Sequence, residues 1–254
     1  MILAAGLGTR LRPLTDDRPK ALVTVAGRTL LEIVLLRLRA AGVREVIVNA
    51  HHYADMIVAY LDANHNFGMT IAVSREEQLL STGGGLKKAA PFFLDSSSSA
   101  REPFLLHNVD VISNLDLARM IRFHTERAAL ATLAVQQRAT SRYLLFDEGG
   151  QLCGRRTANA EAARAEVEQD EPVRPAQQAH ALAFSGVHVI SPRIFAKMEE
   201  QGAFSIVDAY LRLAAQGEKI VPFRADDCYW RDLGRPESVA QAERDLAEGK
   251  YSIP

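Results

Sequence analysis

The most informative part of the sequence for the expected fold is residues 1–20, MILAAGLGTRLRPLTDDRPK. Residues 1–5 are apolar and predict a strand, which runs directly into Gly6-Leu7-Gly8. Glycines at the carboxyl end of a strand leave the backbone N–H groups unhindered, so that they can bend around phosphate oxygens. This stretch therefore predicts a strand followed by a phosphate-binding turn.

Positive charge accompanies the predicted turn. Arg10, Arg12 and Lys20 fall within eleven residues, and residues 1–44 contain eight Lys and Arg against three acidic residues. The stretch is not a Walker A loop, because GxxxxGK followed by Ser or Thr is absent. Leu11 stands where the dinucleotide fingerprint has its third glycine. The absence of these two motifs disfavours a kinase-like and a dehydrogenase-like function.

Beyond residue 20, short runs rich in Val and Ile alternate with amphipathic stretches. The alternation predicts strands at 44–49, 69–74, 103–108 and 129–136, helices at 29–41, 54–62, 115–128 and 236–248, and a glycine turn at 83–85. Thr29 and Glu32 have capping-box spacing at the start of the first helix. Parallel strands joined by helices form an α/β sandwich, whose ligand crevice lies at the carboxyl ends of the strands.

Two stretches interrupt this alternation. Residues 95–102 contain four consecutive serines and predict a solvated loop. Residues 154–178 are rich in Ala, Arg, Glu and Gln, and they predict a short surface helix or a mobile flap.

The composition is typical of a globular protein with a full core, because 48% of the 254 residues are hydrophobic and 24% are charged. Thirty Lys and Arg against thirty-one Asp and Glu exclude a general nucleic-acid-binding surface. No apolar run approaches the about 20 residues of a membrane span. The start has no basic region of the kind found in secretion signals, so we expect a cytoplasmic protein. Cys153 and Cys228 have no metal-binding spacing and are expected to be free thiols.

Residues 6–20 carry a more specific pattern than a glycine turn. They fill every fixed position of G-x-G-T-R-x-R-P-L-T-x-x-x-P-K, and the segment resembles the signature of the sugar-1-phosphate nucleotidyltransferases. The resemblance implies a Rossmann-like three-layer α/β/α sandwich with a mixed, mostly parallel sheet. It also implies one domain over 1–254, with a nucleotide-binding half at 1–110 and a sugar-binding half at 111–254. The family joins a nucleoside triphosphate to a sugar 1-phosphate and releases pyrophosphate.

The resemblance assigns roles within this segment. Arg10 and Lys20 are the expected catalytic residues, since two polyanions must be brought together while negative charge develops on the departing pyrophosphate. The expected nucleotide-binding residues here are Ala4, Ala5, Gly6, Gly8 and Thr9. The attacking phosphate is already anionic, so no general base is required.

Carboxylates are needed for the Mg²⁺ that this chemistry implies, because Mg²⁺ prefers hard oxygen ligands. Asp110 follows the apolar run 103–106, which places it beyond the end of a strand. The family usually has Gly-Asp there, and Val109 departs from that pattern. Asp232 lies in YWRDLGRPE, residues 229–237, which resembles the late W-x-D-x-G-x-P-E motif of the family. Asp110 and Asp232 are therefore the predicted metal ligands.

A glycine triplet at 83–85 supplies the rest of the nucleotide side. Alone, such a triplet is more often a flexible joint. A glycine-rich backbone can also approach a base and ribose closely, and Gln78 or Thr82 can offer a donor and an acceptor to a nucleobase, so Gln78, Gly83 and Gly84 are the expected nucleotide-binding residues here. The T-G-G-G form, residues 82–85, resembles the subgroup that couples UTP to N-acetylmuramic acid 1-phosphate. The segment 184–187, FSGV, resembles the same subgroup. The expected sugar-binding residues are Asn108, Ser185 and Gly186.

Other functions remain open at this point. Within the family, the substrate is alternatively mannose or glucose 1-phosphate with GTP or dTTP, and residues 19–23, PKALV, are shared with enzymes that transfer CMP to phosphocholine. A regulator that binds nucleotide sugars without turnover is the alternative that Val109 favours. H-E-x-x-H and G-x-S-x-G are both absent, which disfavours a zinc protease or a serine hydrolase. We expect a nucleoside triphosphate and a sugar 1-phosphate as partners, no nucleic acid, no membrane, and a possible homo-oligomer.

Overall fold

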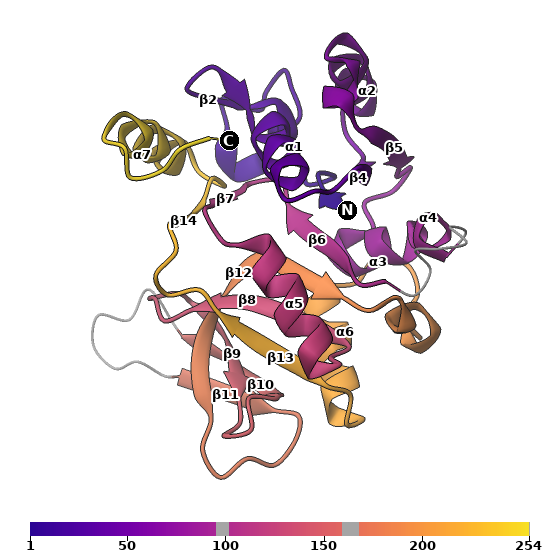
Figure 1. Ribbon diagram of the computed structural model, residues 1–254, viewed down its shortest axis with the longest axis vertical. Coiled ribbons are helices and arrows are strands. Elements are labelled where there is room, and N and C mark those ends of the chain that lie inside the picture. Colours follow the sequence, from indigo (N-terminus) through magenta and orange to yellow (C-terminus); the bar gives the residue numbers. More distant parts are fainter. Residues whose placement is uncertain (95–101, 159–167, 254) are drawn as a thin grey trace.

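The computed structural model describes residues 1–94, 102–158 and 168–253. One sheet runs through both halves of the described chain, with strands in the order β11-β10-β9-β12-β6-β1-β4-β5, and β8 and β13 continue from β12 (Figure 1). The described strands are β1 (Ile2–Leu3), β2 (Thr24–Val25), β3 (Arg28–Thr29), β4 (Glu45–Ala50), β5 (Thr70–Arg75), β6 (Phe104–Asn108), β7 (Val111–Ser113), β8 (Ala131–Gln136), β9 (Arg142–Phe146), β10 (Leu152–Ala158), β11 (Glu168–Pro172), β12 (His180–Ile190), β13 (Ile220–Arg224) and β14 (Trp230–Asp232).

The strand pairings explain why the sheet is mixed. Strands β6, β1, β4 and β5 are parallel neighbours, whereas β12 runs antiparallel to β6, β8 and β9. Two small sheets lie apart from this one, β2 with β3 and β7 with β14, both antiparallel.

Helices join the strands and cover the sheet. The α-helices are α1 (Leu30–Ala40), α2 (Ala54–Ala63), α3 (Ser81–Lys88), α4 (Ala90–Leu94), α5 (Leu117–Arg127), α6 (Ile206–Ala215) and α7 (Pro236–Ala247), and short 3-10 segments are η1 (Thr9–Leu11), η2 (Lys20–Leu22), η3 (His65–Gly68) and η4 (Pro192–Lys197). The predicted cap of α1 is present, since Glu32 N donates to Thr29 Oγ1 at 3.1 Å. In α5, Arg119 N donates to Asp116 Oδ1 at 2.8 Å, so Asp116 caps that helix. Of the described helices, none is long and apolar enough to span a bilayer.

Side-chain alternation builds a core on each face of the sheet. In β4, Val46 and Val48 join one buried cluster together with α1, whereas Ile47 between them joins a second cluster together with α6. Successive residues of a strand point to opposite faces, so an apolar run without alternation predicts burial on both sides. The three-layer sandwich and its mostly parallel central strands confirm the predicted fold class.

One local prediction was wrong, and one of the two alternatives for a second segment is contradicted in the described residues. Residues 83–85 form no turn but lie inside α3, where all three glycines are buried. The described parts of 154–178 contain no surface helix, because residues 154–158 and 168–172 belong to the antiparallel strands β10 and β11. The serine-rich stretch at 95–101 lies outside the described residues. Cys153 and Cys228 are free thiols, as expected.

Close packing explains the glycines of α3. A Cβ added to Gly85 would lie 2.7 Å from both Asn49 Nδ2 and Glu76 Oε1. These two side chains are buried and hydrogen-bonded to each other at 2.7 Å, and Asn49 Oδ1 accepts from Ala4 N at 2.7 Å. Gly85 therefore lets α3 approach the network that holds the end of β1.

This packing predicts an unusual response to Gly85→Ala. In an ordinary helix the change is stabilising by about 1 kcal/mol. Here the added methyl group overpacks a polar core, so we expect a net loss of about 1–3 kcal/mol of unfolding free energy. Chemical denaturation measures the difference. Gly6→Ala is the control, because nothing lies within 4 Å of a Cβ at that position. An unchanged or raised stability for Gly85→Ala would contradict the packing argument.

Candidate active site

The glycine turn after β1 folds back onto Lys20. Gly8 has a φ of +66°, in the left-handed region that favours glycine. A Cβ at this position would lie 3.0 Å from Thr15 Cγ2 and 3.2 Å from Lys20 Cβ. Thr15 Oγ1 donates to Gly8 O at 2.8 Å and closes the turn. The phosphate-binding turn predicted from sequence therefore lies directly beside the predicted catalytic lysine.

Lys20 and Asp110 form an ion pair. Lys20 Nζ donates to Asp110 Oδ2, and their side chains are only 13% and 12% exposed. Asp110 follows β6 by two residues, as expected for a side chain beyond the carboxyl end of a strand. The lysine is therefore turned inward, toward the carboxylate that was predicted to bind metal.

The second predicted metal ligand comes from the far end of the chain. Strand β14 pairs antiparallel with β7, with Asp232 opposite Val111, and Leu233 N donates to Asp110 O at 2.7 Å. The two aspartates are thus brought to neighbouring backbone positions of one small sheet, at the same end as Lys20.

Arg10 joins this group through Gly234. A Cβ at Gly234 would lie 2.6 Å from Asp232 Oδ1 and 3.0 Å from Arg10 Nη2, so the carboxylate and the guanidinium flank one backbone position. Gly234 N donates to Asp232 Oδ1 at 2.7 Å. Arg10, Trp230 and Asp232 also line one cavity of about 270 Å³. The structure therefore brings both predicted cations and both predicted carboxylates into one region.

A larger cavity of about 820 Å³ opens beside Asp232. All three predicted sugar-binding residues line it: Asn108, Ser185 and Gly186. Gly186 has a φ of +74°, and a Cβ there would lie 2.9 Å from Asn108 Nδ2. The Ser185 hydroxyl is buried and has no hydrogen-bond partner among the described residues. A buried polar atom without a partner at the wall of a cavity indicates a site built for a polar ligand.

Val109, the departure from the family pattern, is not among the residues that line these two cavities. It is 2% exposed and belongs to the same buried cluster as Val111 and Leu233. The extra side chain therefore fills the core and does not reduce the space for a ligand.

The predicted nucleotide-binding residues form a less compact group. Ala4 and Ala5 are buried at the end of β1, Gly6 and Thr9 are exposed in the turn, and Gln78 is exposed before α3. The N–H groups of Gly83 and Gly84 both donate to Phe204 O, at 2.9 and 3.4 Å. Their part in binding nucleotide remains a prediction, because packing alone accounts for both glycines.

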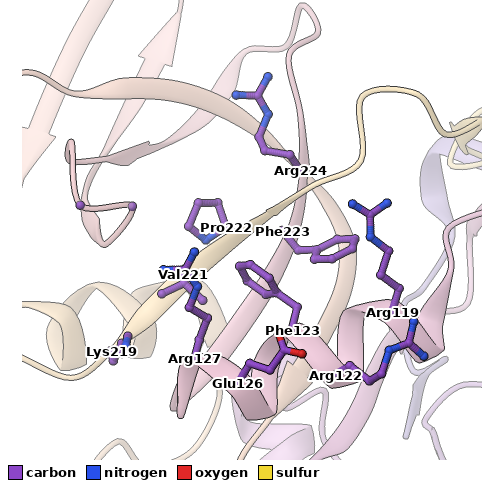
Figure 2. Close-up of a pocket in the computed structure, with 12 residues that line it drawn as sticks. Arg119, Arg122, Phe123, Glu126, Arg127, Lys219, Val221, Pro222, Phe223 and Arg224 are labelled. Atoms are coloured by element: carbon purple, nitrogen blue, oxygen red, sulfur yellow. The ribbon is translucent and has the colours of Figure 1, made fainter.

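A separate cationic cavity of about 440 Å³ lies between α5 and β13 (Figure 2). Five cationic residues line it: Arg119, Arg122, Arg127, Lys219 and Arg224. The guanidinium carbon of Arg119 lies 5.6 Å from the ring centre of Phe223. No residue predicted from the sequence to act in catalysis or binding lines this cavity, so its cations provide matched controls for substitutions at the site.

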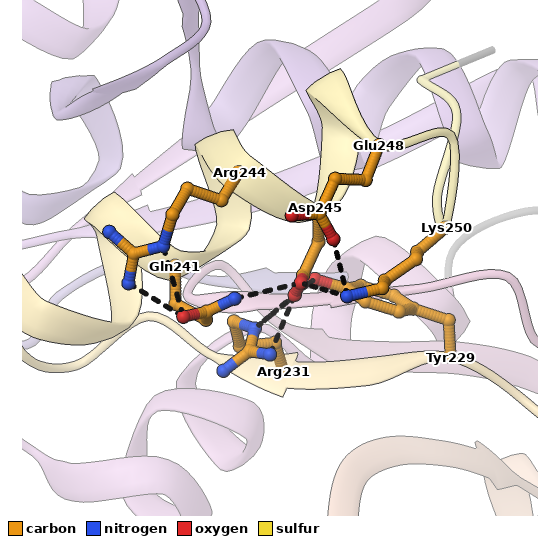
Figure 3. A network of polar contacts seen from close by, with 7 residues as sticks. All are labelled: Tyr229, Arg231, Gln241, Arg244, Asp245, Glu248 and Lys250. Atoms are coloured by element: carbon orange, nitrogen blue, oxygen red, sulfur yellow. Dashed lines mark hydrogen bonds and ion pairs between the residues drawn. The ribbon is translucent and has the colours of Figure 1, made fainter.

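Asp245 holds β14 in place from α7 (Figure 3). Its carboxylate is buried, and it accepts from Tyr229 Oη at 2.9 Å, Arg231 Nη2 at 2.6 Å and Gln241 Nε2 at 2.9 Å. Lys250 Nζ lies 3.7 Å from Asp245 Oδ1. Because Arg231 is adjacent to Asp232, this network fixes the strand that carries a predicted metal ligand.

The network predicts acid-sensitive stability. The hydrogen bond from Gln241, followed by those from Tyr229 and Arg231, lowers the pKa of Asp245 to about 2. An unfolded aspartate has a pKa of about 3.9, so this stabilisation is complete above about pH 4 and is lost as the pH falls through 2. We therefore expect Asp245→Asn to lower Tm at pH 7, and the Tm difference from the wild type to narrow on acidification.

Thermal unfolding between pH 7 and pH 2.5 measures that difference. Glu248→Gln is the control, because Glu248 also pairs with Lys250 but is 54% exposed in its side chain and should contribute little. A Tm difference that stays constant over this pH range would contradict the role of the ionised Asp245.

Sequence reasoning missed Arg138. Its guanidinium carbon lies 3.6 Å from the ring centre of Trp230, and its Nη2 donates to Phe184 O at 2.7 Å. Arg138 lines the 820 Å³ cavity together with the predicted sugar-binding residues. No sequence motif surrounds it, so only the fold could reveal it.

The fold and this clustering of cations and carboxylates define a nucleotide-binding transferase of the α/β class. A family model described as nucleotidyl transferase matches residues 1–249, and the chain belongs to that family.

Individual relatives are similar to most of this chain. N-acetylmuramate alpha-1-phosphate uridylyltransferase of Caulobacter vibrioides is 35% identical, over 98% of this chain and 96% of the relative. The enzyme with the same name from Neisseria meningitidis serogroup B is 32% identical over 78% of each chain. Among solved structures, HddC from Yersinia pseudotuberculosis complexed with GMP-PN superposes with a TM-score of 0.71 at 22% identity, covering 96% of this chain and 97% of that one, which supports the fold.

Proposed function

We propose that this chain transfers the uridylyl group of UTP to N-acetylmuramic acid 1-phosphate and releases pyrophosphate. The observation that carries the proposal is the ion pair of Lys20 and Asp110 next to Arg10 and Asp232, at the carboxyl ends of the strands. Names of the similar enzymes from Caulobacter vibrioides and Neisseria meningitidis support the choice of substrate.

In this reaction a phosphate oxygen of the sugar phosphate forms a bond to the α-phosphorus of the nucleotide. The bond between that phosphorus and the bridging oxygen breaks, and the electron pair leaves with pyrophosphate. Lys20 lies beside the glycine turn, where its ammonium group would draw the two anionic groups together. Arg10 would stabilise the negative charge that develops on the triphosphate.

Asp110 and Asp232 would hold a magnesium ion, because both offer carboxylate oxygens, and the residue after Asp232 is hydrogen-bonded to the main chain of Asp110. The bound ion would offset negative charge on the phosphoryl oxygens. The residues of the chain contribute by fixing the two substrates and the carboxylates in place.

Pyrophosphate release tests the proposal. The purified protein is assayed with each of four nucleoside triphosphates and with N-acetylmuramic acid, glucose and mannose 1-phosphates, with and without Mg²⁺. We expect the highest kcat/KM with UTP and the first sugar, and no turnover without the ion. A preference for a guanylyl or thymidylyl donor with mannose or glucose 1-phosphate would replace the proposed substrates.

The non-catalytic alternative predicts tight nucleotide binding without turnover for any pair. Its one supporting feature was Val109, and the burial of that side chain in the core removes the reason to expect a distorted site.

A further inference from the structure

We infer that Arg138 recognises a carboxylate on the sugar, and that the site is therefore selective for acidic sugar 1-phosphates. This inference rests on the proposed function and names the residue that would set its sugar specificity. The wall of the 820 Å³ cavity carries several charged side chains. Four arginines line it: Arg138, Arg142, Arg155 and Arg156.

Two of these arginines are already neutralised. Arg155 pairs with Glu171 through Nε at 2.7 Å and with Asp208 through Nη1 at 3.0 Å. Arg156 forms a two-point pair with Asp170, at 2.6 and 3.0 Å. Their charge is therefore satisfied within the protein.

Arg138 differs from Arg155 and Arg156 in its partners, and from the exposed Arg142 in its burial. In the described part of the chain no carboxylate lies within ion-pair distance of Arg138, although Asp232 acts on it from further away, and its Nε is buried without a hydrogen-bond partner. Burial lowers the pKa of Arg138, against the influence of nearby Asp232. A half-buried guanidinium without a counter-ion is costly, and an anionic ligand offsets that cost.

Its geometry favours a planar anion. The guanidinium is planar, and its position over the Trp230 ring together with the hydrogen bond to Phe184 O restricts its orientation. A planar guanidinium held in this way matches the two oxygens of a carboxylate. Ser185, whose buried hydroxyl also lacks a partner among the described residues, lines the same cavity and adds a hydrogen-bonding group.

The carboxylate-binding position proposed at Arg138 is distinct from the position of the reacting phosphate. Trp230 precedes Asp232 by two residues in β14, and two extended residues span roughly 7 Å. Because Arg138 lies over the Trp230 ring, a 1-phosphate at Asp232 and a carboxylate at Arg138 would be held at different positions along one strand, on the wall of one cavity. N-acetylmuramic acid carries a carboxylate on a lactyl ether, whereas N-acetylglucosamine is the same sugar without it.

The test compares kcat/KM for the 1-phosphates of these two sugars, with UTP, in the wild type, Arg138→Gln and Arg138→Lys. For Arg138→Gln we expect a loss of roughly tenfold to a hundredfold with the acidic sugar, mostly through KM, and an unchanged value with the neutral sugar. Arg138→Lys keeps the charge but not the planar fork, so it should recover part of the loss.

Arg119→Gln is the matched control, because Arg119 also stacks on an aromatic ring but lines the separate cavity of Figure 2. It should leave both values unchanged, and Tm verifies that each variant folds. Equal losses with the two sugars would overturn the inference, since they would place Arg138 at the phosphate or in the framework. No loss with either sugar would overturn it as well.

Calorimetric binding of UDP-N-acetylmuramic acid and UDP-N-acetylglucosamine separates this inference from the proposed function. If the wild type turns over no pair, the proposed function fails, and a selective loss of affinity for the acidic product in Arg138→Gln still supports the inference. If the wild type turns over a neutral sugar best and binds both products equally, the transferase function stands and the inference fails.

Discussion

Asp110→Asn should lower kcat for pyrophosphate release by about 10³-fold, because it removes a charged oxygen ligand while keeping the shape of the side chain. The fold should persist, since the main-chain bond from Leu233 N to Asp110 O does not involve the altered group. Steady-state kinetics over a range of Mg²⁺ concentrations measures the effect.

Asp116→Asn provides the matched control for that substitution. Asp116 caps α5 at a distance of 2.8 Å from Arg119 N, and asparagine caps helices equally well. We expect the control to retain wild-type kcat. Full activity in Asp110→Asn would remove Asp110 from the mechanism and, with it, the proposed ion site.

Lys20→Met should lower kcat/KM by about 10²- to 10³-fold, because the ammonium group would hold the two phosphates together during the displacement. If the charge stabilises the transition state, kcat itself should fall, and the loss should not come from a higher KM alone. Lys20→Met also leaves Asp110 without its cation, so Tm has to be measured alongside the kinetics.

Lys219→Met controls for the loss of a positive charge, since Lys219 lines the separate cationic cavity. It should have wild-type kcat/KM. If Lys20→Met were folded and as active as this control, the ion pair with Asp110 would be structural only.

The sequence predicted the fold and the centre of the site because both depend on strong local patterns. The apolar runs of β4 and β6 are buried on both faces, and a strand of that kind has few alternatives. The motifs that predicted the site have the residue types and spacing expected for phosphate and metal binding, and they contain Gly8, Lys20, Asp110 and Asp232. Their meeting could be expected from the motifs, but the pairing of β7 with β14 that causes it is visible only in the structure.

The misses have physical reasons. The glycines of α3 let the helix pack closely against its surroundings: Gly83 against Phe204, Gly84 against Gly202 O, and Gly85 against Asn49 and Glu76. A single sequence does not distinguish such packing from a flexible turn. Strands β10 and β11 are held together partly by charged cross-strand pairs, with Arg156 opposite Asp170, and a charged stretch lacks the apolar period that identifies strands. Arg138 is a single arginine whose environment exists only after folding.

The pairing of β7 with β14 also affects the stage of folding at which the candidate site is complete. Trp230 lies opposite Ser113, so a growing chain makes all four central parallel strands long before it makes the segment that carries Asp232. Contacts between residues so far apart in sequence close late in folding, because the intervening chain must be ordered first. A partly synthesised or partly refolded chain can therefore contain the parallel strands of the sheet before Asp232 has joined Asp110.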